Sequence, residues 1–309
     1  MTQCKGWDED AIYYPRRIGV YLRVDTLVWW LPEGGSPILL PYHMRTISVA
    51  GEWLAGVNAQ GDSVYLFKAG GLLPYERFTL PCKINAMGCL SRGKSAYLYG
   101  GGANVIWQGK FESKKNSWEW SQHSQRIWDT ITGVVVSPAF VGVGSASLLR
   151  VYQPGERMPF HEVRLPGRLK VLWVGSPSEV GGIVEIGDMP YNFSYDVFAR
   201  FLEVDTLQRA RYHFCQYSPY FHPSFGVEYI GLVRLSAEGL LTPGGFTNVR
   251  SFSADFLGGR VFFLRGDSVW EASLTTPTVP PHFHLSYSGA EEIEVVAVYR
   301  YGSAEFTMR

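Results

Sequence analysis

The chain has 309 residues and carries 28 basic and 28 acidic side chains, so its formal net charge is zero. This balance excludes nucleic-acid binding driven by overall charge, because any basic surface would have to be local. Hydrophobic residues make up 46% of the chain, and no run of about 18 apolar residues occurs, which predicts a large core and no membrane-spanning helix. The polar, acidic start "MTQCKGWDEDAIYY" predicts a cytoplasmic protein, or one from which a signal peptide has been removed.

Short strands are the elements predicted along the chain. The first unit offers three runs, "IGVYLRV", "TLVWWLP" and "PILLP", and the stretch from Thr46 to Pro81 offers four, "TISVAG", "EWLAGVNA", "SVYLFKAG" and "YERFTLP". These runs are rich in β-branched and aromatic residues and are separated by glycine-containing turns, which is typical of strands. The next two units repeat the pattern. Only "YDVFARFLEVDTLQRARYHF", from Tyr195, fits a helix as well as strands.

Prolines near the ends of the strand runs reveal a period. They are Pro41, Pro81, Pro166, Pro243 and Pro277, and the two longest gaps leave room for further ends near His123 and Asp205. The resulting mean spacing of about 39 residues, with several short strands in each unit, is the signature of a β-propeller. We therefore expect one all-β domain over residues 1–309 with about seven four-stranded blades, although six or eight blades also fit.

A recurring short motif supports this expectation. "VDTLVWW", "GDSVYLF" and "GDSVWEA" each place a turn-forming pair before an aromatic-rich run. Asp bonds its own backbone in tight turns and Gly accepts positive φ, so the motif predicts a turn into the third strand of a blade. We expect the aromatic side chains that follow to pack between neighbouring blades.

The two ends of the chain are predicted to meet. The first unit shows only three strong strands, and the last residues add "HFHLSYS", "EIEVVAVYR" and "SAEFTMR". An open ring would expose raw strand edges, so we expect this tail to complete the first blade. Removal of the residues after Ala290 should then cost far more than removal of a surface tail.

One stretch resembles a known repeat type. "SAYLYGGGANVIWQGKFESKKNSWEW", from Ser95 to Trp120, is similar to a kelch repeat in its double glycine, polar hairpin and closing tryptophan. The dipeptide "WD" occurs at Trp7 and at Trp128, as in WD-type repeats, but no "GH" dipeptide accompanies it. The resemblance implies the propeller superfold and no specific family, and a superfold does not define a function.

Motifs for catalysis are absent from the sequence. There is no G-x-S-x-G, and "GGGANV" leads into a predicted strand, so it cannot place phosphate at a helix N-terminus. His282 and His284 share one strand face, but two ligands do not make a metal site. We expect no metal and no cofactor, and a non-catalytic role over an enzymatic one.

Two sets of residues are candidates for partner binding. A basic residue follows each predicted blade end, which would surround one mouth of the ring: Arg45, Lys83, Arg126, Arg168, Arg209 and Arg250. Such a ring of cations would focus a positive field on an acidic partner. A possible aromatic interface consists of Trp118, Trp120, Tyr220 and Phe221, although packing between blades is the favoured explanation for the tryptophans.

The predicted function is a protein-interaction or scaffold module within a larger assembly, which binds a protein or peptide, possibly acidic, through loops on one face. A carbohydrate-binding propeller is the first alternative, because ten tryptophans and eighteen tyrosines supply rings for sugars. A hydrolase or lyase with carboxylates or histidines at the central channel is the second.

Overall fold

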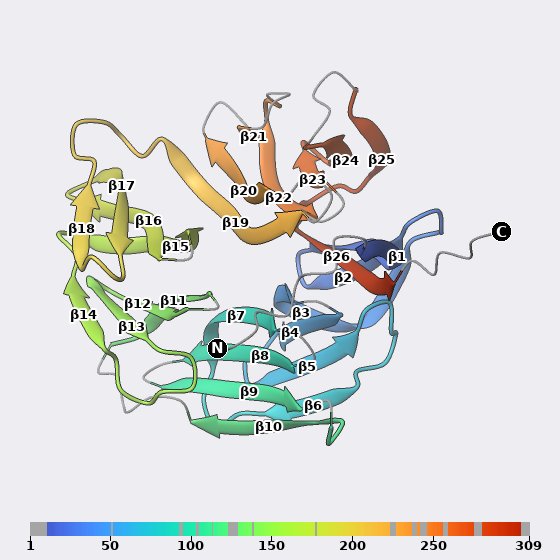
Figure 1. Ribbon diagram of the computed structural model, residues 1–309, viewed down its shortest axis with the longest axis horizontal. Coiled ribbons are helices and arrows are strands. Elements are labelled where there is room, and N and C mark those ends of the chain that lie inside the picture. The colour runs from blue at the N-terminus through green and yellow to red at the C-terminus, as the bar shows by residue number, and fades with distance from the viewer. Residues whose placement is uncertain are drawn as a thin grey trace, which may run out of the picture.

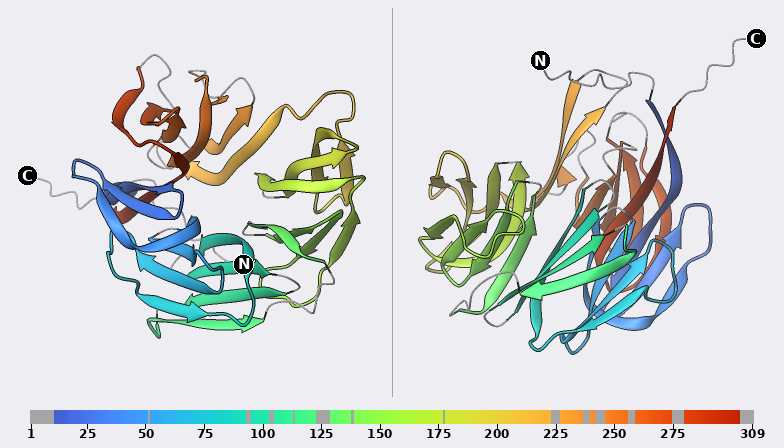
Figure 2. Two further views of the ribbon diagram at one scale, coloured as in Figure 1. Left: turned by 180° about the vertical axis from the view of Figure 1, so that it is seen from behind. Right: turned by 60° about the horizontal axis from the view of Figure 1, so that its bottom comes forward.

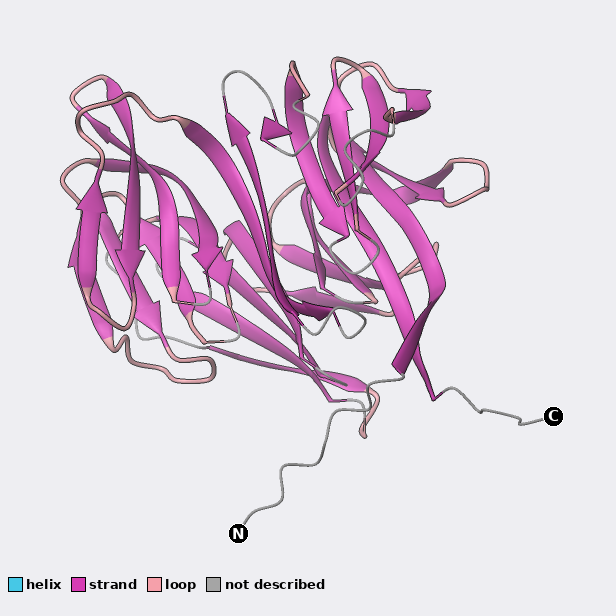
Figure 3. Ribbon diagram, turned by 45° about the horizontal axis from the view of Figure 1, so that its top comes forward, coloured by secondary structure: helices cyan, strands magenta, loops and turns pink. Residues whose placement is uncertain are grey.

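Antiparallel sheets surround a common axis in the computed structural model (Figure 1). It describes residues 11–50, 52–92, 95–102, 105–112, 114–122, 129–137, 139–176, 178–222, 227–236, 240–241, 246–255, 259–274 and 280–303. Over these ranges every regular element is a strand (Figure 3), and no helix there could cross a membrane. The predicted all-β propeller is confirmed.

The described strands form seven blades, and in each blade the first strand named lies at the channel and the last lies outermost. Blade 1 holds β26 (Ala290–Ser303), β1 (Ala11–Val24), β2 (Leu27–Pro32) and the first half of β3 (Ile38–Ala50). Blade 2 holds the second half of β3, β4 (Trp53–Asn58), β5 (Ser63–Lys68) and β6 (Glu76–Thr79). Blade 3 holds β7 (Ile84–Arg92), β8 (Ser95–Gly102), β9 (Ile106–Glu112) and β10 (Ser117–Gln122).

The remaining blades complete the ring. Blade 4 holds β11 (Ile131–Val136), β12 (Val141–Ser145), β13 (Leu148–Tyr152) and β14 (His161–Arg164). Blade 5 holds β15 (Arg168–Ser176), β16 (Glu179–Ile186), β17 (Met189–Asp196) and β18 (Phe201–Val204). Blade 6 shows β19 (Tyr212–His222), β20 (Val227–Ser236) and β21 (Leu240–Leu241). Blade 7 holds β22 (Val249–Asp255), β23 (Arg260–Arg265), β24 (Ser268–Ser273) and β25 (His282–Ser286).

The β3 strand belongs to two blades. Its residues 38–43 pair with β2, and its residues 44–50 pair with β4. Hydrogen bonding is therefore continuous from β26 to β6, in one seven-stranded sheet.

Ring closure occurs at blade 1, as predicted. The β26 strand pairs with β1 along its length, from Ala11 opposite Ser303 to Val24 opposite Ala290. The assignment of "HFHLSYS" to this blade was wrong. That segment is β25, which pairs with β24 as the outer strand of blade 7, and the predicted blade end at Pro277 is one strand too early. Blade 1 needs only one strand from the tail, because β3 already supplies its outer strand.

The stretch from Tyr195 that fitted either a helix or strands forms strands. It contains the end of β17, a turn over residues 197–200, β18 and the start of β19. Tyr195, Val197, Leu202 and Val204 pack in the cluster between blades 4 and 5, and this packing overrides the helical spacing.

The turns divide between two faces of the ring, seen edge-on in the right panel of Figure 2. Antiparallel strands place successive turns at opposite ends of a blade. We call the end with the second-to-third-strand turns and the links between blades the connection face, and the other end the distal face. The predicted turns at Asp25, Gly61 and Gly266 all join a second to a third strand and have φ of 55°, 84° and 58°, so the turn prediction is confirmed.

The core lies between blades. Seven clusters of buried apolar side chains are present among the described residues. Six of them each join two neighbouring blades, and the seventh lies in blade 5, with Ala210 of the link to blade 6 packed against it. We call each contact between neighbouring blades a seam. The predicted packing of aromatic runs between blades is confirmed by Trp30 and Phe67 in seam 1–2 and by the partly buried Trp270 in seam 6–7.

Candidate functional site

A β-bulge begins the inner strand of every blade on the connection face. In each case one extra residue interrupts the pairing of the inner strand with the second strand: Arg45, Asn85, Thr132, Lys170, His213, Arg250 and Glu291. A bulge turns the extra side chain out of the regular alternation. Seven polar side chains thus start at equivalent backbone positions around one mouth of the channel.

The predicted rim cations fall on or near these bulges. Arg45 and Arg250 are bulge residues, Lys83 and Arg168 precede a bulge residue by two positions, and Arg209 precedes one by four. Arg126 lies outside the described residues. The side chains of Lys83, Arg168, Arg209 and Arg250 are exposed, whereas Arg45 is partly buried over Gly61. Their action as a partner-binding rim stays a prediction.

Acidic side chains share this mouth. Arg250 Nη1 lies 3.8 Å from Asp267 Oδ1, and Lys170 Nζ lies 2.8 Å from Glu185 Oε2. In blade 1 the bulge residue is the acidic partner instead of the basic one, and Glu291 Oε2 lies 2.6 Å from Arg23 Nη1. Exposed pairs of this kind add little stability, but they reduce the positive field. The mouth of the channel therefore carries both basic and acidic side chains.

Inner strands of the ring line a cavity of about 360 Å³. Glu292 and Glu294 of β26 contribute its carboxylates, and Arg23 Nε lies 2.8 Å from Glu292. Glu294 touches the cavity but is surrounded by protein on most sides. This burial, aided by the charge of Glu292, raises the pKa of Glu294 to about 8. Burial also raises the pKa of the Cys89 thiol across the channel to about 12, which leaves it a poor nucleophile.

The predicted aromatic residues lie in two places. Trp118 is buried in seam 2–3, and Trp120 is partly buried and stacks on Phe78 with ring centroids 4.3 Å apart. Tyr220 and Phe221 lie in β19 opposite Tyr229 and Glu228, and their side chains are outside the described residues.

Exposed apolar side chains gather instead at the distal face. The turns from third to fourth strand present large apolar residues in blades 1, 2, 4 and 5: Ile38 and Leu39, Leu72 and Leu73, Met158 and Phe160, and Phe198 and Phe201. The most exposed aromatic residues are Phe198 at 70% and Phe201 at 61%. We call Met158, Phe160, Phe198 and Phe201 the blade 4–5 apolar surface. Exposed apolar groups of this size are typical of interaction sites.

The turn that carries Phe198 is rigid. Asp196 Oδ1 accepts hydrogen bonds from the backbone N–H groups of Phe198 and Ala199, at 2.9 and 2.7 Å. Val197 is buried, and Arg200 has a φ of 56°. A non-glycine residue in this region is strained and persists only where its surroundings fix it, often at a functional site. The side chain of Phe198 is therefore presented to solvent by a preorganised backbone.

The two turns of this surface are joined across seam 4–5. Phe160 contacts His161 with ring centroids 4.4 Å apart, and His161 Nδ1 lies 2.9 Å from Tyr195 Oη. Burial and the nearby charge of Arg200 lower the pKa of His161, so the contact is made by a neutral imidazole at neutral pH. Sequence reasoning missed this surface because apolar residues in the turns read as strand or core. The two prolines and glycine of "QPGERMPF" were the available signal for a long exposed turn.

Comparison with known proteins gives the fold and no family. No protein-family model and no curated protein matches the chain. Among solved structures, the chain is similar to Kuenenia stuttgartiensis hydrazine synthase with 11% identity and a TM-score of 0.50, over 74% of this chain and 76% of that chain. It is similar to BBS1N in complex with ARL6DN, with 12% identity and a TM-score of 0.52, over 73% and 75% of the two chains.

A third structure extends over more of the chain. It is a functionally unknown protein from Desulfotomaculum acetoxidans, with 9% identity and a TM-score of 0.57, over 91% of this chain and 99% of that one. At these identities the likeness shows the β-propeller fold alone.

Proposed function

We propose that this propeller is a non-catalytic interaction module that binds a protein partner on its distal face. The observation that supports this is the pair of exposed phenylalanines on the rigid turn of blade 5, beside the exposed Met158 and Phe160 of blade 4. Preorganised aromatic side chains bind with little loss of conformational entropy and serve as interface anchors.

The chemistry of the partner follows from the charges around these side chains. Arg157 and Arg200 lie in the same two turns, and neither forms an ion pair with a carboxylate among the described residues. A segment that combines apolar side chains with Asp or Glu would meet both features. An acidic protein or peptide was also predicted from the sequence, but for the cationic mouth on the connection face. A protein complex is also recorded for the similar propeller BBS1N, which was solved with ARL6DN.

Photo-crosslinking tests the proposal. A benzophenone amino acid at position 198 is expected to capture a partner from the native host, and the double substitution Phe198→Ser with Phe201→Ser is expected to reduce co-purification of that partner at least tenfold, which corresponds to roughly 1.4 kcal/mol. The matched control is Phe283→Ser, since Phe283 is also exposed but lies on β25 of blade 7.

The charges are tested separately. Arg157→Glu should weaken capture and reduce its dependence on salt, because an attraction to carboxylates is screened by ions. Equal capture by the double variant, the Phe283→Ser control and the parent protein would refute the assignment to this surface.

A further inference from the structure

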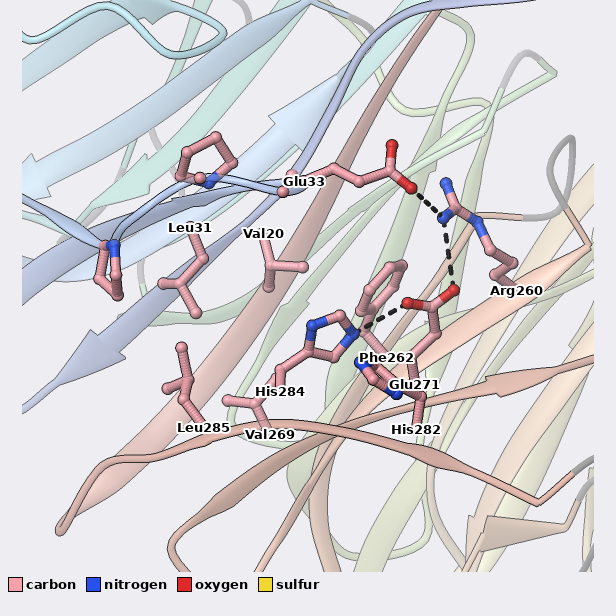
Figure 4. A pocket seen from close by; sticks show the side chains of 15 residues that line it. Val20, Leu31, Glu33, Arg260, Phe262, Val269, Glu271, His282, His284 and Leu285 are labelled. Atoms are coloured by element: carbon pink, nitrogen blue, oxygen red, sulfur yellow. Dashed lines mark hydrogen bonds and ion pairs between the residues drawn. The ribbon is translucent and has the colours of Figure 1, made fainter.

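A second site is built into seam 7–1, where the ring closes. Its cavity of about 390 Å³ opens at the distal end of the seam, between the β1–β2 pair of blade 1 and β23, β24 and β25 of blade 7 (Figure 4). This volume is in the range of pockets that hold small molecules.

The floor of this seam pocket is apolar. Val20, Leu31, Phe262 and Val269 are all buried and line it, and Leu285 adds a partly buried side chain. Figure 4 shows Val20, Leu31 and Leu285 across the cavity from a polar wall. The floor would exclude water from the body of a ligand and favour a hydrocarbon or aryl group.

The polar wall is a connected network. Arg260 Nη1 donates to Glu33 Oε1 at 3.0 Å and to Glu271 Oε1 at 3.3 Å, and Arg260 Nη2 donates to Asp255 Oδ2 at 3.3 Å. His284 Nε2 lies 2.8 Å from Glu271 Oε2, and the ring of His282 lies 4.9 Å from that of His284. These contacts lock the orientation of the carboxylates and of one imidazole.

The wall carries more negative than positive charge. The carboxylates of Glu33, Glu271 and Asp255 share the single guanidinium of Arg260. With Nε2–H of His284 donated to Glu271, its Nδ1 is left as an acceptor. Glu33 bonds Arg260 through one oxygen, and its side chain is 57% exposed at the entrance. The atoms that remain for a ligand are therefore acceptors.

We propose that the seam pocket binds a small organic cation, a primary ammonium attached to an apolar aliphatic or aryl body. The three N–H groups of an ammonium match the free acceptors of Glu33 and His284, and the body fits the floor formed by Val20, Leu31 and Leu285. The net charge of the wall opposes carboxylates and phosphates. No group of three or more metal-ligating residues occurs in the part of the chain that the structure describes, which argues against a metal ion as the ligand.

The charged and titratable groups that face the pocket are Glu33 on the β2–β3 turn, Arg260 on β23, Glu271 on β24, and His282 and His284 on β25, with Asp255 behind Arg260. The lining residues of β1 carry no charge.

Calorimetric titration with 2-phenylethylamine tests the proposal. A dissociation constant between roughly 10 µM and 1 mM is expected for a ligand of this size. The isosteric probes 2-phenylethanol and 3-phenylpropanoate should bind at least tenfold more weakly. Saturable binding of the anion in preference to the amine, or no saturable binding of the amine up to about 10 mM, would overturn the proposal.

Substitutions locate the site. Glu33→Gln should weaken amine binding at least tenfold, and Val269→Phe should abolish it by filling the cavity. The control Glu162→Gln, which removes the exposed pair with Arg150 in blade 4, should leave it unchanged. Since Glu33 is exposed, its variant should fold, and unchanged amine binding in both Glu33→Gln and Val269→Phe would also refute the proposal. The seam pocket is independent of the blade 4–5 apolar surface, so either proposal can fail alone.

Discussion

Seams 2–3 and 7–1 each hold two neighbouring blades together, but they do so with different kinds of side chain. Seam 2–3 is filled with rings: Trp53 lies 4.7 Å from Phe111 and 5.4 Å from Trp118, measured between centroids, and Phe78 stacks on Trp120. Seam 7–1 has an aliphatic interior that includes Leu22, Leu264 and Ile293, and then gives way to the ion network and the seam pocket.

The difference separates two roles of a seam. Ring-filled seams remove a large apolar area from water and stabilise the fold. An ion network contributes less net stability, because its charges must be desolvated, but it holds side chains in defined positions around open space. The seam at which the ring closes thus holds the seam pocket.

Loss of the closing strand should have the largest effect. Truncation after Gly289 removes β26, which pairs with β1 along its length and contributes Ala290 and Ile293 to seam 7–1. We expect no cooperative unfolding transition in the product, because blade 1 and its seam lose their inner strand. Truncation after Ser303 is the control, since it keeps every β1–β26 pair. A cooperative transition in the shorter product would show that closure by β26 is dispensable.

Removal of a ring from seam 2–3 should come next. Trp118→Ala is expected to lower the free energy of unfolding by roughly 3–5 kcal/mol, because a buried indole leaves a large cavity. Trp118→Phe should cost much less, since Trp118 Nε1 has no hydrogen-bond partner among the described residues and only ring volume is reduced. Denaturant unfolding measures both changes. Equal losses for the two variants would mean that the packing account of this seam is incorrect.

Addition of one methylene group should distinguish the filled seam from the hollow one. Val64 in seam 2–3 and Val269 in seam 7–1 are both fully buried valines, but only Val269 lines a cavity. Val64→Leu should destabilise the protein by roughly 1–3 kcal/mol through overpacking, whereas Val269→Leu should change stability by less than about 1 kcal/mol. The comparison of thermal midpoints is decisive, and a larger loss for Val269→Leu would contradict the cavity.

Acid should weaken seam 7–1 slightly more than seam 2–3. Burial acts to raise the pKa of Glu271, but its hydrogen bond to His284 and the charge of Arg260 together lower that pKa below its ordinary value. A lowered carboxyl pKa stabilises the fold above the unfolded-state value of about 4.3, and this contribution is lost as the pH falls through the folded-state value. Hydrogen exchange in β23 and β24 should accelerate below about pH 4.3 relative to β5 and β9. Parallel behaviour of the two regions would count against the network.

Much of the fold could be predicted from the sequence because it depends on local rules. Asp25, Gly61 and Gly266 mark turns by backbone chemistry, and the period of the strand runs reflects the repeated unit. The position of β25 was mispredicted because the whole C-terminal tail was assigned to the first blade, which takes only β26 from it. The sequence predicted a break after Pro41, whereas β3 continues as one strand from blade 1 into blade 2.

The sites were harder to predict because exposure is a tertiary property. The cations were placed by spacing alone, and spacing cannot distinguish a bulge residue such as Arg250 from a neighbour such as Arg168, two residues before its bulge. Phe198 and Trp118 are both large aromatic residues in strand-rich sequence. Only the packing of the blades makes one exposed and the other buried.

The double membership of β3 has a mechanical consequence. Because main-chain hydrogen bonds run unbroken from β26 to β6, any displacement of β1 or β2 is passed to blade 2 through stiff covalent and hydrogen-bonded links. Among the described residues no strand of blade 7 pairs with a strand of blade 1, and the two blades meet through side chains and the covalent link from β25 to β26. A molecule bound between blades 7 and 1 would therefore displace blades 1 and 2 together relative to the other five blades. The hinge of this movement would lie at the seam that the molecule occupies.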